Sequence, residues 1–143
     1  MSAKRRRLRQ YASRFTLHAS RFGCGVDVVE LARFRNALAR GGRAFLRRVF
    51  TNEEEAYARV RRRTRLLHLA GRFAAKEAVM KAVSQVDPRR VLAMNEIEVR
   101  NDRWGRPRIV LHDDARRRTR PLRIYVSLSH VETVAVASAI ATY

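Results

Sequence analysis

The chain has 143 residues, enough for one domain with a hydrophobic core and too few for two ordinary domains. Hydrophobic residues make up 46% of the chain, but no uninterrupted apolar run approaches the roughly 20 residues of a membrane-spanning helix, so we expect no membrane association. A net charge of +19 predicts a negatively charged partner: a nucleic acid, an acidic protein or a phosphate-rich cofactor.

The N-terminal segment, residues 1–22, holds seven basic and no acidic side chains and lacks the long apolar stretch of a secretory signal. We expect a disordered basic extension followed by one domain over residues 23–143. The same composition also fits an organellar transit peptide, which is an alternative to a cytoplasmic protein. The single cysteine, Cys24, lies among apolar residues and glycines, which predicts a buried, inert thiol.

Residues 25–29, GVDVV, are typical of a short β-strand and carry one acid, Asp27, the first acidic residue of the chain. From residue 31 to residue 38, apolar side chains recur at helical spacing, with arginines away from that stripe. This pattern predicts an amphipathic basic helix that ends at the Gly41–Gly42 pair.

The segment TNEE, residues 51–54, has the spacing of a capping box, in which Thr51 and Glu54 satisfy each other's backbone amides. A new helix should therefore begin there. Its acidic first turn favours a structural role over metal binding, because negative charge stabilises a helix N-terminus. The basic run in residues 59–65 is interpreted as a solvated face or connection.

A long helix is predicted to run through Val83, and charged residues interrupt its apolar stripe. At about 100° per residue, Glu77 falls on the face of Leu66, Leu69, Phe73 and Met80, with Lys81 at the margin. A buried, unpaired charge is costly, so these two side chains should meet a metal, an opposite charge or a charged ligand. Asp27 is the natural partner of Glu77, because two carboxylates and a lysine suit magnesium-dependent phosphate chemistry.

The C-terminal half alternates charged and apolar residues, which favours strands. Residues 96–111 read as a β-hairpin with its turn at 101–107, and strands are expected over 123–129 and 133–140. We therefore predict an α+β fold: a single domain with an antiparallel sheet packed against helices.

Five blocks in order, GVDVVELARF, TNEEEAYA, GRFAAKEAVMKA, WGRP and VSLSH, resemble holo-acyl-carrier-protein synthase, a 4'-phosphopantetheinyl transferase family. The resemblance runs from about Cys24 to Ile140. It implies a phosphopantetheinyl transferase-like fold and transfer of the 4'-phosphopantetheine arm of coenzyme A to a serine of apo-acyl carrier protein. Adenosine 3',5'-bisphosphate is the implied second product, with magnesium as cofactor and coenzyme A as co-substrate.

The resemblance also implies residue roles. Asp27 and Glu77 match the magnesium ligands, and Glu77 is also placed to orient or deprotonate the serine, although the identity of the general base stays open. Lys81 is assigned to the pyrophosphate as a catalytic residue. The implied coenzyme A contacts are Arg72, Lys81, Pro107 and His130.

Three arginines of the basic helix and its turn, Arg33, Arg40 and Arg43, match the part of the family that docks the acidic carrier protein. The family's homotrimer, with sites between subunits, is the expected assembly, and the cytoplasm is the expected location. The alternative function is a basic nucleic-acid-binding protein without catalysis. It leaves Asp27 and Glu77 unexplained, and the chain has no zinc-finger spacing or ribonucleoprotein aromatic motif, so we expect no specific nucleic-acid partner.

Overall fold

A computed structural model describes residues 21–143, so residues 1–20 of the predicted extension lie outside the described residues. The elements in chain order are β1 (Phe22–Glu30), α2 (Leu31–Val49), α3 (Asn52–Arg59), η1 (Arg62–Thr64), α4 (Arg65–Val86), η2 (Met94–Glu96), β2 (Ile97–Asn101), β3 (Pro107–Leu111), α5 (Asp113–Thr119), β4 (Arg123–His130) and β5 (Val134–Thr142). Helices and antiparallel strands share one domain, as the sequence predicts. No helix in this part of the chain has the length and apolarity to cross a membrane.

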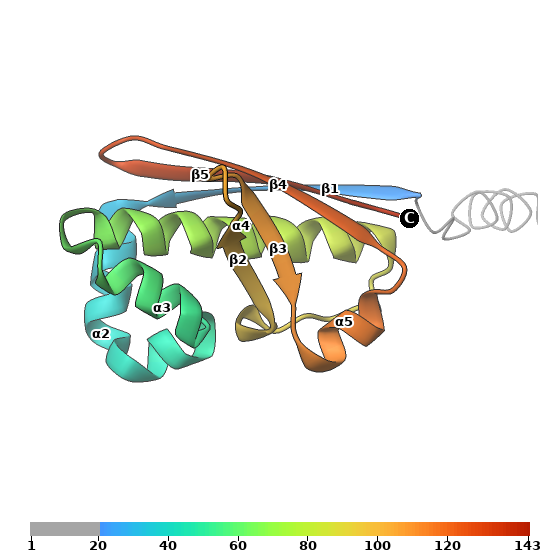
Figure 1. The fold of residues 1–143 in the computed structure, drawn as a ribbon, viewed down its shortest axis with the longest axis horizontal. Coiled ribbons are helices and arrows are strands. Elements are labelled where there is room, and N and C mark those ends of the chain that lie inside the picture. The colour runs from blue at the N-terminus through green and yellow to red at the C-terminus, as the bar shows by residue number, and fades with distance from the viewer. Residues whose placement is uncertain (1–20) are drawn as a thin grey trace, which may run out of the picture.

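Helix α4 is the centre of the fold (Figure 1). One of its sides packs on a three-stranded antiparallel sheet with the order β1-β5-β4, and the other elements lie on its far side. Eight of the 22 residues of α4 are buried alanines and valines, for example Ala74, Ala78 and Val79. The helix is therefore enclosed on several sides, because small side chains let neighbouring backbones come close.

This arrangement corrects the single apolar stripe that the sequence predicts for this helix. Of the stripe, Leu69 is fully buried, whereas Leu66, Phe73 and Met80 are only half-buried. The residues of the predicted stripe other than Leu69 therefore border a surface, and Glu77 lies among them.

The hairpin of β2 and β3 forms a separate two-stranded sheet, in which Ile97 pairs with Leu111 and Asn101 with Pro107. The hairpin predicted over residues 96–111 is confirmed.

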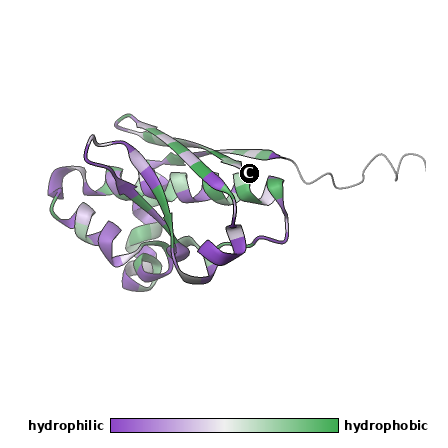
Figure 2. Ribbon diagram, turned by 45° about the vertical axis from the view of Figure 1, so that its right-hand side comes forward, coloured by the Kyte–Doolittle hydropathy of each residue, from purple (hydrophilic) through white to green (hydrophobic). Residues whose placement is uncertain are grey.

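Hydrophobic colour follows the strands and α4 in Figure 2, and hydrophilic colour dominates the helices of the far layer. Helix α5 has no counterpart in the prediction, because its sequence, DDARRRT, offers only Ala115 as an apolar anchor.

The capping box is confirmed: the Glu54 amide donates to Thr51 Oγ1 over 3.3 Å, and the Thr51 amide donates to Glu54 Oε2 over 3.0 Å. Helix α2 breaks where the prediction ends it, at Gly42, whose φ of 50° suits a residue without a Cβ. It then resumes and continues to Val49.

The prediction for Cys24 is wrong, because its thiol is exposed. Side chains alternate between the two faces of a strand, and α4 occupies the inner face of β1 at Gly23 and Gly25. Cys24 therefore lies on the outer face of the sheet with Val26 and Val28, which are 58% and 61% exposed. Composition along the chain does not reveal which face of a strand the core covers.

Candidate functional site

Two glycines bring β1 unusually close to α4. A Cβ placed on Gly25 would lie 2.0 Å from the carbonyl oxygen of Ala78, and one on Gly23 equally close to that of Ala82. Asp27 follows on the same face of the strand, since alternate residues share a face. The close approach therefore places the Asp27 carboxylate against the helix that carries Glu77 and Lys81.

The structure brings these three predicted residues together. Lys81 Nζ lies 2.8 Å from Asp27 Oδ1 and donates to the carbonyl oxygen of Val26 over 2.9 Å. Burial raises the pKa of Glu77 most, the negative charge of Asp27 raises it further, and Lys81 partly opposes both. Two carboxylates thus lie near enough to repel each other, with one ammonium between strand and helix to offset part of that repulsion.

The implied magnesium ion would meet two carboxylates here, those of Asp27 and Glu77. Over residues 21–143, no group of three or more His, Cys, Asp or Glu side chains could hold a metal by itself. Magnesium, however, usually keeps several waters and takes one or two carboxylates together with substrate phosphates. The mutually repelling Asp27 and Glu77 fit that kind of partial site, and both line the same cavity.

That cavity, here the carboxylate cavity, has a volume of about 570 Å³ and lies between β1, α2 and α4. Its walls include the rings of Phe34, Phe45 and Phe73, which pack on one another with centroids 5.5–6.4 Å apart. Arg33 and Arg40 also line it. Two of the predicted docking arginines thus line the same cavity as the carboxylates, whereas Arg43 is exposed on α2 and does not line it.

A second cavity, here the hairpin cavity, has a volume of about 220 Å³ and brings together the other predicted contacts. Arg72 from α4, Pro107 from the hairpin and His130 from β4 all line it. Arg72 is 6% exposed, and its guanidinium donates to the Asn101 side chain over 3.2 Å. The Asn101 amide in turn donates to the carbonyl oxygen of Gly105 over 2.8 Å. The hairpin turn and Arg72 are therefore held as one unit.

Lys81 is predicted to contact coenzyme A together with Arg72, Pro107 and His130, but it does not line the hairpin cavity and lies beside Asp27 instead. Arg72 and Glu77 are five residues apart, about 140° around the helix, so they project from different sides of α4. The carboxylate cavity and the hairpin cavity share no lining residue. The predicted site residues thus form two clusters within one chain.

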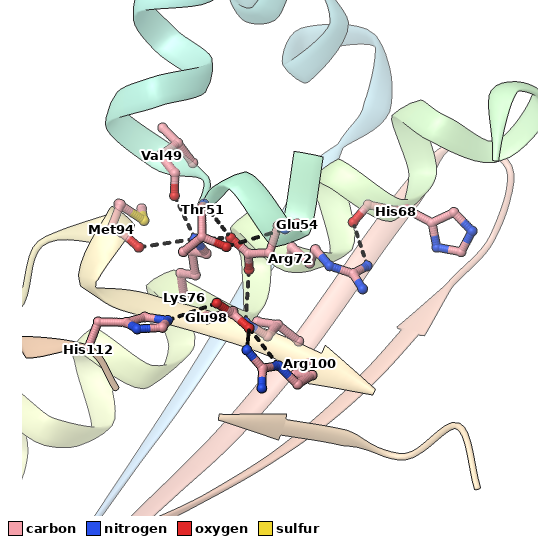
Figure 3. Close-up of polar contacts among 11 residues, drawn as sticks. Val49, Thr51, Glu54, His68, Arg72, Lys76, Met94, Glu98, Arg100 and His112 are labelled. Carbon is pink, nitrogen blue, oxygen red and sulfur yellow. Dashed lines mark hydrogen bonds and ion pairs between the residues drawn. The ribbon is translucent and has the colours of Figure 1, made fainter. Parts of the chain in front are cut away.

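A third polar cluster was not predicted from the sequence. Lys76, next to Glu77, is fully buried and donates to Glu54 Oε2 over 2.5 Å and to the carbonyl oxygens of Val49 and Met94 (Figure 3). Glu54 also accepts the Val99 amide over 2.8 Å. These contacts join α2, α3, α4 and β2 around one ion pair.

The polar partners of the pair show that it is structural. The three donors of Lys76 all meet oxygens of the protein, and burial lowers its pKa most, while Glu54 opposes that shift. Nearby, Glu98 is also buried and lies 2.8 Å from His112 and 2.6 Å from Arg100. In the sequence, Glu54 is recognisable only as part of a capping box. Nothing in that local pattern indicates that Lys76, 22 residues later, will form a buried ion pair with it.

The chain matches known proteins over the region that carries these clusters. The family described as the 4'-phosphopantetheinyl transferase superfamily matches residues 23–137. A holo-acyl-carrier-protein synthase of Moorella thermoacetica is 43% identical over 119 residues, which cover 81% of this chain and 90% of that protein. The holo-acyl-carrier-protein synthase of Mycobacterium leprae is 38% identical over 120 residues, which cover 80% of this chain and 92% of that protein.

Solved structures agree with the sequence comparison. An ACPS–CoA complex of Chronobacterium ammoniagenes has a TM-score of 0.75 and 34% identity, and the match covers 87% of this chain and 98% of that one. The acyl carrier protein synthase of Mycobacterium tuberculosis has a TM-score of 0.67 and 35% identity, with 83% and 95% covered. The described fold is therefore the fold of these proteins.

Proposed function

The chain belongs to the 4'-phosphopantetheinyl transferase superfamily, and from that premise we propose that it is a holo-acyl-carrier-protein synthase. It transfers 4'-phosphopantetheine from coenzyme A to a serine of apo-acyl carrier protein. The observation that carries the proposal is the cluster of Asp27, Glu77 and Lys81, whose two carboxylates line the same cavity as Arg33 and Arg40. The similarity of the fold to a chain bound to coenzyme A supports it.

In the proposed reaction, the serine oxygen forms a bond to the pantetheine-side phosphorus while the pyrophosphate oxygen bridge to that phosphorus breaks. Adenosine 3',5'-bisphosphate leaves with the bridging oxygen, and the serine proton is lost. Such a transfer depends on positioning and on the neutralisation of oxygens that gain charge. Lys81, half exposed beside Asp27, supplies positive charge to the pyrophosphate, and Glu77 orients the serine or accepts its proton.

Asp27 and Glu77 would hold the magnesium ion that the family implies. When bound, that ion supplies positive charge to the phosphate oxygens. The raised pKa of Glu77 indicates a position where added positive charge is favourable.

The test is transfer to apo-acyl carrier protein, followed by mass spectrometry. We expect Glu77→Gln and Asp27→Asn to lower turnover at least about a hundredfold, as is typical when a charged catalytic group is removed, without unfolding the domain. Removing the divalent metal with a chelator should stop transfer, and added magnesium should restore it. Near-normal turnover of both variants at limiting magnesium would refute the two-carboxylate site.

We propose that Arg33 and Arg40, with Arg43 beyond them, dock the acidic carrier protein. The first two line the carboxylate cavity, so a partner bound there would present its serine to Glu77. Arg33→Glu combined with Arg40→Glu should raise the KM for carrier protein much more than that for coenzyme A, because rim charges act mainly on encounter. Equal changes for both substrates would mean that the carrier protein docks elsewhere.

The assembly is proposed to be a homotrimer through the outer face of the three-stranded sheet. That face exposes Val26, Val28, Tyr125 and Ile140 by half or more, and a contiguous apolar surface of this kind is typical of an interface. Replacing Val28 by Asp should give monomers in light scattering, whereas the same change at exposed Val91, outside the sheet, should not. An unchanged mass for the Val28 variant would contradict this interface.

The cytoplasm is proposed as the place of the reaction. An exposed free thiol, Cys24, is compatible with a reducing compartment. A nucleic-acid-binding role is not favoured, because the relatives are enzymes by name and that role leaves the carboxylate pair without a purpose.

A further inference from the structure

A third cavity, here the α5 cavity, is lined by residues of β3, α5, β4 and the turn between the last two. Its volume is about 400 Å³, which is within the usual range of small-molecule sites. It shares no lining residue with the carboxylate cavity or the hairpin cavity. The α5 cavity is therefore separate from both clusters of predicted site residues.

The walls of the α5 cavity are mostly apolar. Six of its nine described lining residues are Ile109, Val110, Leu111, Pro121, Leu122 and Ile124. The hydroxyl of Thr119, another lining residue, already donates to the carbonyl oxygen of Ala115 over 2.8 Å. Apart from two arginines, the described lining side chains thus offer a ligand no free hydrogen-bond donor.

Those two arginines, Arg116 and Arg120, are exposed and give the cavity a positive charge. None of the described lining residues is an aspartate or glutamate. Among the side chains that the structure describes, neither arginine forms an ion pair, although both Arg117 and Arg118 beside them do. The charge of Arg116 and Arg120 is therefore available to an anionic ligand.

The acids of this region are already neutralised by other arginines. Asp114 pairs with Arg117, and Glu96 pairs with Arg118 over 2.7 Å. These two carboxylates consequently do not compete with a ligand for the arginines that line the cavity.

The α5 cavity is also separate from the surface that we propose for the trimer. Ile124 lines the cavity and is half-buried, whereas Tyr125, the next residue of β4, is 53% exposed. Successive side chains of a strand point to opposite faces. The cavity therefore lies on the other side of β4 from the proposed subunit interface.

We propose that the α5 cavity binds a medium-chain fatty acid, with the alkyl chain on the apolar wall and the carboxylate at Arg116 and Arg120. Two guanidiniums suit a carboxylate, because each planar group can donate two parallel hydrogen bonds to it. The alkyl chain gains free energy by leaving water and needs no polar partner. A nucleotide or sugar suits the cavity less, because its buried hydroxyls and nitrogens would lose their hydrogen bonds to water.

The experiment is a methyl NMR titration of the full chain with hexanoate, octanoate and decanoate below their micelle concentrations, and with 1-octanol as the uncharged analogue of octanoate. We expect the methyl signals of Ile109, Leu122 and Ile124 to shift. Affinity should rise about fourfold for each added methylene, the gain from burying that group. 1-Octanol should bind about 5- to 25-fold more weakly than octanoate, since it forms no ion pair.

The double variant Arg116→Gln, Arg120→Gln should weaken decanoate binding by the same factor of about 5–25, the loss of two exposed ion pairs, and leave 1-octanol binding unchanged. The matched control is Arg117→Gln, Arg118→Gln, which removes the same charge from the same helix at positions that do not line the cavity. This control should change decanoate affinity by less than about twofold.

Three results would overturn the proposal. If the lining methyl signals do not shift with decanoate, the cavity is not a fatty-acid site. Equal weakening by both double variants would indicate general attraction to a basic surface, and equal affinities for octanoate and 1-octanol would remove the role of the arginines. The titration involves no transfer reaction, so its failure is distinguishable from failure of the proposed function.

Discussion

Helix α4 carries two lysines with opposite expected roles, and replacing each by methionine separates folding from catalysis. Lys76 is fully buried against Glu54, itself 1% exposed, whereas the Lys81 side chain is 49% exposed beside Asp27. Methionine keeps the length of the lysine stem but removes the charge. In the Lys76→Met variant, Glu54 would keep its backbone donors, the amides of Thr51 and Val99, and lose its cation.

The expected loss follows from the burial of the pair. Breaking a buried ion pair by removing one partner typically costs about 3–5 kcal/mol, because the remaining charge is left without compensation. For a domain of this size, that cost corresponds to a fall of about 10–20 °C in Tm. Lys81→Met breaks a partly solvated pair and should cost less than about 1 kcal/mol of unfolding free energy, yet it should lower turnover strongly.

The assay is thermal and urea unfolding of both variants followed by circular dichroism, together with the double variant Glu54→Gln, Lys76→Met. Removing both charges should make the double variant more stable than the sum of the single effects by about 1–3 kcal/mol. A fall in Tm of only a few degrees for Lys76→Met would refute the reasoning. Strict additivity in the double variant would show that the two charges do not stabilise each other.

Gly25→Ala should destabilise the domain by about 1–3 kcal/mol or more in urea unfolding, because its Cβ would meet backbone at 2.0 Å; a neutral result would mean that β1 can shift without loss. The raised pKa of Glu77 means that its ionised form costs stability above its unfolded-state pKa, so Glu77→Gln should raise Tm at pH 7.5, and the gain should vanish below about pH 4. In an NMR titration, the pKa of Glu77 should fall in Asp27→Asn and rise in Lys81→Met, since these changes remove a negative and a positive neighbour. Shifts in the opposite directions would contradict the assigned causes.

The sequence by itself determined the local features, because their causes lie within a few residues. The capping box needs only Thr51 and Glu54, and the hairpin needs only alternation and a turn with glycine and proline. The grouping of Asp27 with Glu77 also followed from the sequence, since a carboxylate in an apolar strand or helix requires an explanation wherever the fold places it.

Only the tertiary structure decided which faces are covered. Cys24 is exposed because α4 packs on the glycine face of β1, a choice made by contact with residues more than 50 positions away. For the same reason, Lys76 and Glu77 are neighbours in the chain, yet one closes a buried ion pair and the other faces a cavity. Arg61 and Arg72 likewise belong to separate segments of the chain, yet both guanidiniums contact the ring of Tyr57, 3.6 and 4.0 Å from its centroid. No spacing rule predicts that contact from the sequence.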